Sequence, residues 1–185
     1  MKQTILFVDA GYLSYISKFF GGGKSLRYKI EDFAKNVCKS FNLECHEIFF
    51  YIAPPFQSPR PTEEENKRKA NYDRFIERLK VVKPKIHIRE GRLQKINGSF
   101  AQKGVDTLIT MDLLKTAIKK EVEEIVIVTS DTDFVPIIND IRKNEGIKVN
   151  LAYYTDRKRK SAFSLSNHLW KAVDKKLLIK KEYFK

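Results

Sequence analysis

The chain has 185 residues, 42% of them hydrophobic, which is enough for one domain with a buried core over residues 1–185. No stretch approaches the roughly 20 consecutive apolar residues of a membrane helix, so a membrane-spanning protein and a membrane partner are not expected. The formal net charge of +13 favours a polyanionic partner such as nucleic acid, with a merely solubilising surface as the alternative.

Short apolar runs alternate with longer segments of helical period, a pattern typical of a parallel sheet built from βαβ units. We expect strands at residues 3–9, 46–52, 85–90, 124–130 and 147–153. We expect helices near residues 30–41, 62–80, 105–120, 133–144 and 164–174, with Gly146 just after the fourth of them. Residues 20–28 and 53–61 form long loops. The predicted fold is α/β, a three-layer sandwich around a mainly parallel sheet of five or six strands.

A set of acidic residues is associated with the ends of these elements. Asp9 ends the first predicted strand, Asp131 follows the fourth, and Asp133 lies two residues further on. Ligands of open parallel sheets bind outside the carboxyl ends of the strands, so Asp9 and Asp131 meet if their strands are neighbours. Asp106, at the start of a helix, can point to the same edge. Clustered carboxylates repel one another unless a cation neutralises them, and their oxygens suit Mg²⁺ or Mn²⁺.

Each of these acids also has a structural alternative. Asp9 can close a turn, the dipole of a helix can favour Asp106 in its first turn, and Asp133 or Thr132 can cap the following helix. Asp112 lies roughly 120° around the helix from Asp106, because the two are six residues apart. We therefore expect Asp112 to be solvated or to support the site without belonging to it.

Three motifs carry a resemblance to a known family: VDAGYL at residues 8–13, QKGVDTLITMDLL at 102–114 and VIVTSDTDFVPII at 126–138. Together they resemble the NYN domain in its LabA/DUF88 branch, a PIN-like nuclease group, over residues 4–176. The resemblance implies a Rossmann-like PIN fold with strand order 3-2-1-4-5 and metal-dependent cleavage of RNA. It assigns catalysis and metal binding to Asp9, Asp106, Asp131 and Asp133. Family members usually carry Asn where this chain has Tyr12, which puts catalysis in question and not the fold.

Basic segments flank the acidic one. Residues 60–103 carry 13 basic and 6 acidic side chains, and residues 151–185 carry 10 and 3. In the predicted helix at 62–80, Tyr72 and Phe75 accompany cations and could stack on RNA bases, but we favour a buried stripe of Phe75, Ile76 and Leu79 under a solvated face. Residues 157–160 are either phosphate contacts or an exposed loop. The predicted substrate-binding residues are Ser130, Thr132, Lys103, Arg157, Lys158, Arg159 and Lys160.

The sequence therefore predicts a cytoplasmic ribonuclease that uses Mg²⁺ or Mn²⁺ and acts on single-stranded RNA. The alternatives are an RNA-binding module that has lost cleavage and, less suited to the basic flanks, a metal-dependent phosphatase. Cys38 and Cys45 fit no metal or redox spacing and are expected as reduced thiols. The segment at 21–25, GGGKS, lacks the first glycine of a P-loop, so a nucleotide site is not expected. The oligomeric state, including a homodimer, is left open.

Overall fold

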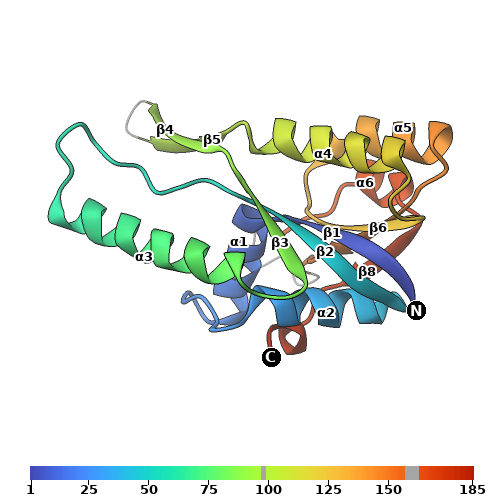
Figure 1. The fold of residues 1–185 in the computed structure, drawn as a ribbon, viewed down its shortest axis with the longest axis horizontal. Helices are drawn as coiled ribbons and strands as arrows, with labels where there is room; N and C mark the ends of the chain where they lie inside the picture. Colours follow the sequence, from blue (N-terminus) through green and yellow to red (C-terminus); the bar gives the residue numbers. More distant parts are fainter. Residues whose placement is uncertain (97–98, 157–162) are drawn as a thin grey trace.

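The computed structural model of the protein describes residues 1–96, 99–156 and 163–185. Its central feature is a six-stranded parallel sheet with the strand order β3-β2-β1-β6-β7-β8 (Figure 1). The strands are β1 (Lys2–Asp9), β2 (Leu43–Ile52), β3 (Lys85–Glu90), β6 (Glu124–Val128), β7 (Lys148–Tyr153) and β8 (Lys175–Leu178). The predicted α/β fold with a parallel sheet is confirmed, and the five predicted strands lie in the order 3-2-1-4-5.

Helices cover both faces of the sheet. One face carries α1 (Ala10–Phe20), α2 (Ile30–Ser40) and α3 (Glu63–Lys80), and the other carries α4 (Val105–Lys119), α5 (Val135–Asn144) and α6 (Asn167–Ala172) (Figure 1). Strand β1 shows why both faces are covered. Its residues Leu6 and Val8 belong to the core on the α1 and α2 side, while Ile5 and Phe7 belong to the core on the α4 and α5 side. A strand buried on both faces needs an uninterrupted apolar run, such as ILFV.

Helix α1 is absent from the sequence prediction, which has no element between the first strand and the loop at residues 20–28. The helix begins directly after β1, with no intervening turn. It buries Leu13 and Ile16 completely, and removing these side chains from water stabilises it. The helix ends at Phe20, and Gly22 then has a φ angle of +65°, which glycine adopts at little cost.

A small antiparallel hairpin stands apart from the main sheet. It consists of β4 (Arg92–Ile96) and β5 (Ser99–Lys103) and lies beside the start of α4 (Figure 1). The sequence prediction lacks this hairpin, whose strands have no continuous apolar run, and it also lacks the short edge strand β8. Side chains alternate between the two faces of a strand, so Phe100 and Gln102 share one face of the hairpin and Lys103 belongs to the other.

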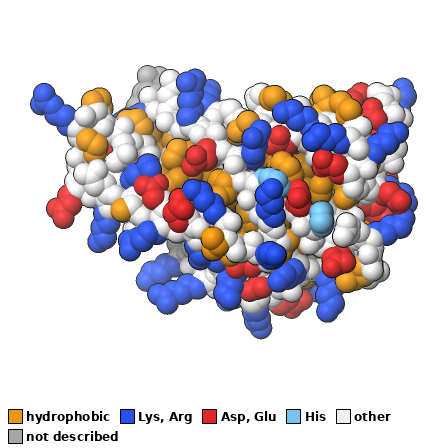
Figure 2. Space-filling view, viewed as in Figure 1, with side chains coloured by type: hydrophobic (Ala, Val, Ile, Leu, Met, Phe, Trp, Pro, Cys, Tyr) orange, Lys and Arg blue, Asp and Glu red, His pale blue; other side chains and the backbone are white. Residues whose placement is uncertain are grey.

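Several cations of α3 are paired with acidic neighbours. Arg78 contacts Glu31 of α2 at 3.1 Å, and Lys80 contacts Glu77 at 2.5 Å. The apolar side of the helix packs on the core, where Leu79 is fully buried. The interpretation of α3 as a buried stripe under a solvated face is therefore confirmed, and Figure 2 shows acidic and basic side chains mixed over this side of the molecule. In the described part of the chain, no helix is long and apolar enough to cross a membrane.

Candidate active site

Asp9 joins the central strand to α1. Its Oδ1 accepts a hydrogen bond from the backbone N–H of Tyr12 at 3.1 Å and caps the helix. Burial raises the pKa of the Asp9 carboxyl, the backbone N–H groups of Tyr12 and Gly11 oppose this rise, and the negative charges of Asp106 and Asp131 add to it. Asp9 therefore has the structural role that the sequence offered as an alternative, in the turn that follows the first strand. The charges of two other predicted acids also act on its pKa.

Asp131 and Asp133 lie in the turn after β6. This strand pairs directly with β1 in parallel, so the turns after both strands open at the same edge of the sheet. Asp131 caps the short 3-10 helix η1 (Thr132–Phe134): its Oδ1 accepts from the Asp133 backbone N–H at 2.9 Å. The N–H of Asp131 in turn donates to Oγ1 of the buried Thr129 at 3.1 Å. The first hydrogen bond orients the Asp131 carboxylate, and the second fixes the backbone that carries it.

Asp106 reaches this edge from the other direction, in the first turn of α4, where it is exposed. Gly104, at the N-terminus of the helix, has a φ angle of +83° that favours glycine, and it carries the chain from the hairpin into α4. Partial burial raises the pKa of the Asp106 carboxyl, and the charges of Asp131 and Asp133 raise it further.

The four predicted acids thus share one electrostatic site at the C-terminal edge of β1 and β6. The charges of Asp106 and Asp131 raise the pKa of Asp9, and the charges of Asp131 and Asp133 raise the pKa of Asp106. Like charges held together favour binding of a cation, and carboxylate oxygens fit Mg²⁺ or Mn²⁺, which retain several waters. Among residues 1–96, 99–156 and 163–185, no three His, Cys, Asp or Glu side chains are arranged to hold a metal ion. The donor chemistry fits a metal, but these rotamers do not form a closed coordination shell.

Tyr12 connects α1 to the segment after β7. Its phenol oxygen accepts from the Tyr154 N–H at 2.8 Å, and its hydroxyl donates to the Tyr154 carbonyl oxygen at 3.3 Å. Burial raises the pKa of Tyr12 to about 12, so the phenol is neutral at physiological pH and unsuited to act as a base. Because it satisfies both backbone groups of one residue, Tyr12 has a structural role beside Asp9.

Gln102 is a polar residue of this site that the sequence prediction lacks. A β-carbon at Gly11 would lie 3.4 Å from Gln102 Oε1 and 3.2 Å from Asp9 Oδ1, so the amide and the carboxylate lie close together around the start of α1. The sequence signal that could have identified Gln102 is its position in the QKGVD motif, which also contains Asp106. Asp156, in YYTD after β7, is a further acid that follows a strand at this edge and that the sequence prediction lacks.

Asp112 supports α4 from the inside of the molecule. Arg89 of β3 donates to both of its carboxylate oxygens, at 2.8 Å and 3.2 Å, and the Tyr51 hydroxyl donates to it at 3.1 Å. The expectation that Asp112 could be solvated is wrong, because the residue is only 5% exposed. Its burial, together with the exposure of Asp106, agrees with the helical spacing that places the two on different sides of α4.

The predicted substrate-binding residues differ in position. Ser130 is half-buried beside the Tyr12 hydroxyl, whose pKa it lowers, and Thr132 is exposed at the start of η1. Lys103 is exposed at the end of β5, on the hairpin face opposite Gln102. The four remaining predicted residues lie outside the described part of the chain: Arg157, Lys158, Arg159 and Lys160.

Comparison with known proteins identifies the family. A sequence model of the NYN domain matches residues 3–175, nearly the whole chain. The chain belongs to the NYN domain family. The NYN part of the resemblance carried by the three motifs is thereby confirmed, and the matched region of the NYN domain includes all four predicted acids.

Two relatives illustrate what this NYN domain resembles. The uncharacterized protein y4oD of Sinorhizobium fredii (strain NBRC 101917 / NGR234) is 42% identical over 60 residues, which is 32% of this chain and 28% of that protein's length. The crystal structure of VPA0982, a protein of unknown function from Vibrio parahaemolyticus RIMD 2210633, matches with a TM-score of 0.64 over 100% of this chain and 96% of that chain. At 18% identity, this second likeness shows a shared fold alone.

Proposed function

We propose that this NYN domain is a divalent-metal-dependent ribonuclease that hydrolyses phosphodiester bonds of RNA. The observation that carries the proposal is the acidic site, where three motifs far apart in the sequence supply carboxylates close enough for the charge of Asp131 to act on both Asp9 and Asp106. A protein with a formal charge of +13 attracts a polyanion to such a site. Membership of the LabA/DUF88 branch, a PIN-like origin and a cytoplasmic location belong to the same proposal.

Asp9, Asp106, Asp131 and Asp133 are the residues that would hold Mg²⁺ or Mn²⁺, directly or through water. When bound, such an ion polarises a phosphate oxygen and lowers the pKa of a water ligand. The chain prepares two of the carboxylates in advance. Asp9 is oriented by its cap of α1 and Asp131 by its cap of η1, so both lose little freedom when they bind a ligand.

Gln102 supplies an amide beside Asp9, in a site whose relatives usually carry an asparagine in the first motif. Tyr12 occupies that motif position, and its hydroxyl is bonded to the backbone of Tyr154. We therefore assign a role to Gln102: its amide N–H groups donate to a phosphate oxygen of the substrate and so orient it. Ser130 and Thr132, next to Asp131, orient substrate or water.

The hairpin face that carries Gln102 favours single-stranded RNA over a duplex as the ligand. Phe100 on that face is 53% exposed, with the Lys95 ammonium 5.9 Å and the Phe56 ring 5.4 Å from the centre of its ring. Unpaired bases stack on exposed aromatic rings beside cations. The proposed substrate is accordingly single-stranded RNA, with a base on Phe100 and the backbone over the acids.

The rival function is RNA binding without cleavage. Two observations favour it: Tyr12 in place of the usual asparagine, and the absence, in the described residues, of three acidic, histidine or cysteine side chains arranged to hold a metal ion. The basic surface serves both functions equally, so the two differ only in whether the phosphodiester bond is broken.

Incubation of end-labelled single-stranded RNA with the pure protein in Mn²⁺, Mg²⁺ or EDTA separates the two functions. We expect cleavage products with metal and none in EDTA. Asp131→Asn should abolish cleavage and spare binding, because asparagine can still cap η1 and the fold is retained. Asp140→Asn, at an exposed acid of α5, is the matched control and should cleave like the wild type. A gel shift without products in either metal would establish the rival function.

A further inference from the structure

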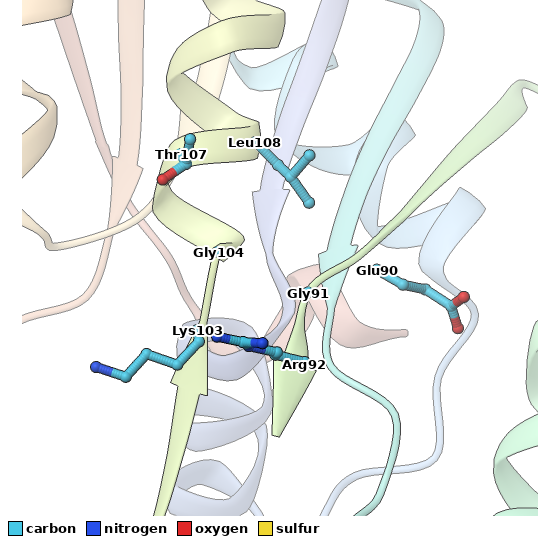
Figure 3. A pocket seen from close by; sticks show the side chains of 7 residues that line it. All are labelled: Glu90, Gly91, Arg92, Lys103, Gly104, Thr107 and Leu108. Carbon is cyan, nitrogen blue, oxygen red and sulfur yellow. The ribbon is translucent and has the colours of Figure 1, made fainter. Parts of the chain in front are cut away.

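A cavity of about 460 Å³ lies at the junction of the hairpin and α4, and most of its lining has no task in the proposed chemistry (Figure 3). Arg92 and Lys103 line it from the base of the hairpin, and Thr107 and Leu108 line it from the first turns of α4. We propose that this cavity is a phosphate-binding subsite, in which Arg92 and Lys103 hold a phosphate of the RNA strand away from the bond that is cleaved. The inference rests on the proposed ribonuclease function.

Arg92 and Lys103 are direct cross-strand neighbours in the hairpin. Such residues project from the same face with their β-carbons about 4.5–5.5 Å apart, and like charges in this arrangement destabilise the pair. Neither side chain forms an ion pair with any residue that the structure describes. A like-charge pair without a counterion weakens the hairpin, whereas an anion between the two cations would be attracted by both.

The lining of the cavity includes one acid, Glu90, whose carboxylate is engaged elsewhere. Glu90 accepts a hydrogen bond from the Tyr72 hydroxyl of α3, and in Figure 3 its side chain extends away from that of Lys103. Asp106, which precedes Thr107, belongs to the acidic site. The two cations are therefore open to an external anion.

The cavity is a fixed part of the fold. A β-carbon at Gly91 would lie 2.7 Å from Val105 Cγ2 and 2.8 Å from the Lys103 carbonyl oxygen, so only glycine lets the chain pack this closely here. The Gly91 N–H also donates to the last residue of β2 at 2.9 Å, which ties the turn to the main sheet. Thr107 adds a hydroxyl and Leu108 an apolar surface that can contact a ribose.

The cavity and the acidic site are next to each other along two elements. In β5, Gln102 faces Asp9 while the adjacent Lys103 projects from the opposite face and lines the cavity. In α4, Asp106 belongs to the acidic site while the adjacent Thr107 lines the cavity. One RNA strand can thus place one phosphate at the acids and another between Arg92 and Lys103.

The double variant R92Q/K103Q tests this inference in EDTA, where binding is measured without cleavage. We expect its Kd for single-stranded RNA to rise about tenfold, since charged hydrogen bonds are lost. The slope of log K against log salt should flatten by about 0.7, the value for one phosphate of a single strand. The variant should melt at the same temperature as the wild type or slightly higher, because a repulsive pair has been removed.

K35Q/K39Q is the matched control, because it removes two exposed cations from α2, on the opposite face of the sheet, and it should leave the Kd unchanged. Single methylphosphonate linkages, placed in turn along the RNA, locate the phosphate: at the bound position a neutral linkage should weaken binding to the wild type but not to R92Q/K103Q. RNAs with 5′-hydroxyl and 5′-phosphate ends distinguish an internal phosphate from a terminal one, since only a terminal site would prefer the phosphorylated end.

Three outcomes would overturn the inference. If the wild type cleaves RNA and R92Q/K103Q binds equally well, the subsite is wrong and the ribonuclease proposal stands. The same holds if every neutral linkage affects both proteins to the same extent. If the wild type neither binds nor cleaves RNA, both proposals are wrong together.

Discussion

Substitution of Asp112 and of Asp106 by Asn should have opposite effects, although both residues lie on α4. Asp112→Asn removes the charge from a buried group that accepts two hydrogen bonds from Arg89 and one from Tyr51. Breaking a buried ion pair costs about 3–5 kcal/mol. The Arg89 side chain is 35% exposed and keeps contact with water, and asparagine keeps one acceptor oxygen, so we expect the free energy of unfolding to fall by about 2 kcal/mol.

In a protein of 185 residues this loss corresponds to a fall in Tm of roughly 4–8 °C. Cleavage by Asp112→Asn, measured well below its Tm, should stay close to that of the wild type, because Asp112 lies on the inner side of the helix. Asp106→Asn should lose cleavage and keep its Tm or gain slightly. Partial burial, together with the charges of Asp131 and Asp133, raises the pKa of Asp106, so a neutral side chain is favoured there.

Thermal unfolding by circular dichroism and cleavage of end-labelled RNA, on the same preparations, give both quantities. Arg89→Gln, alone and combined with Asp112→Asn, completes a double-mutant cycle. The double variant should lose less stability than the sum of the two single losses, because both substitutions remove the same ion pair. A Tm of Asp112→Asn within about 1 °C of the wild type would show that the ion pair adds nothing. Severe loss of cleavage in both single variants, with folding intact, would place Asp112 in the acidic site.

Four further outcomes are expected. Mn²⁺ should raise the Tm of the wild type by mass action and not that of Asp131→Asn; an equal rise in both would locate the ion elsewhere. The folded protein raises the pKa of Asp9 above its ordinary value of 3.8, so the folded state binds this proton more tightly than the unfolded state. The resulting contribution to the free energy of unfolding is fully present below pH 3.8 and is lost as the pH rises through the raised pKa. Asp9→Asn should therefore raise the Tm at pH 7 and leave it unchanged near pH 3, and a rise of equal size at both pH values would contradict this. Tyr12→Phe removes the hydroxyl that pairs with the backbone of Tyr154. It should lower the free energy of unfolding, measured by urea denaturation, by about 1–3 kcal/mol without loss of cleavage. Phe100→Ala should weaken binding of single-stranded RNA by about 1–3 kcal/mol and spare duplex RNA, and equal weakening of both would refute base stacking.

The acidic site could be predicted from the sequence because strong local signals position its members. Asp9 and Asp131 follow the apolar runs ILFV and IVIV, which are typical of strands buried on both faces, and the ends of neighbouring parallel strands meet at one edge. Helix α1 was predictable in part, since Leu13, Ile16 and Phe20 have helical spacing, but no turn separates it from β1. Asp9 serves as the end of one element and the cap of the next, so the usual boundary is missing.

The position of Gln102 could not be predicted in this way. Asn97-Gly98, between the two strands in the sequence, is a strong hairpin signal, so the existence of the hairpin was open to prediction. Its placement over Asp9 was not. Gln102 lies close to Gly11, a residue more than 90 positions earlier, and no periodic pattern indicates how a hairpin outside the main sheet packs.

Strand β1 comes first in the chain but lies in the centre of the sheet, with consequences for biosynthesis. One neighbour, β2, is complete at residue 52, whereas the other, β6, begins only at residue 124. A nascent chain can therefore form the β3-β2-β1 half while the other edge of β1 is still unpaired, and an open apolar edge promotes aggregation. The acids are divided in the same way, because Asp9 belongs to the early half while Asp106, Asp131 and Asp133 emerge later. The acidic site can therefore assemble only after translation has passed β6 and the two halves of the sheet have joined.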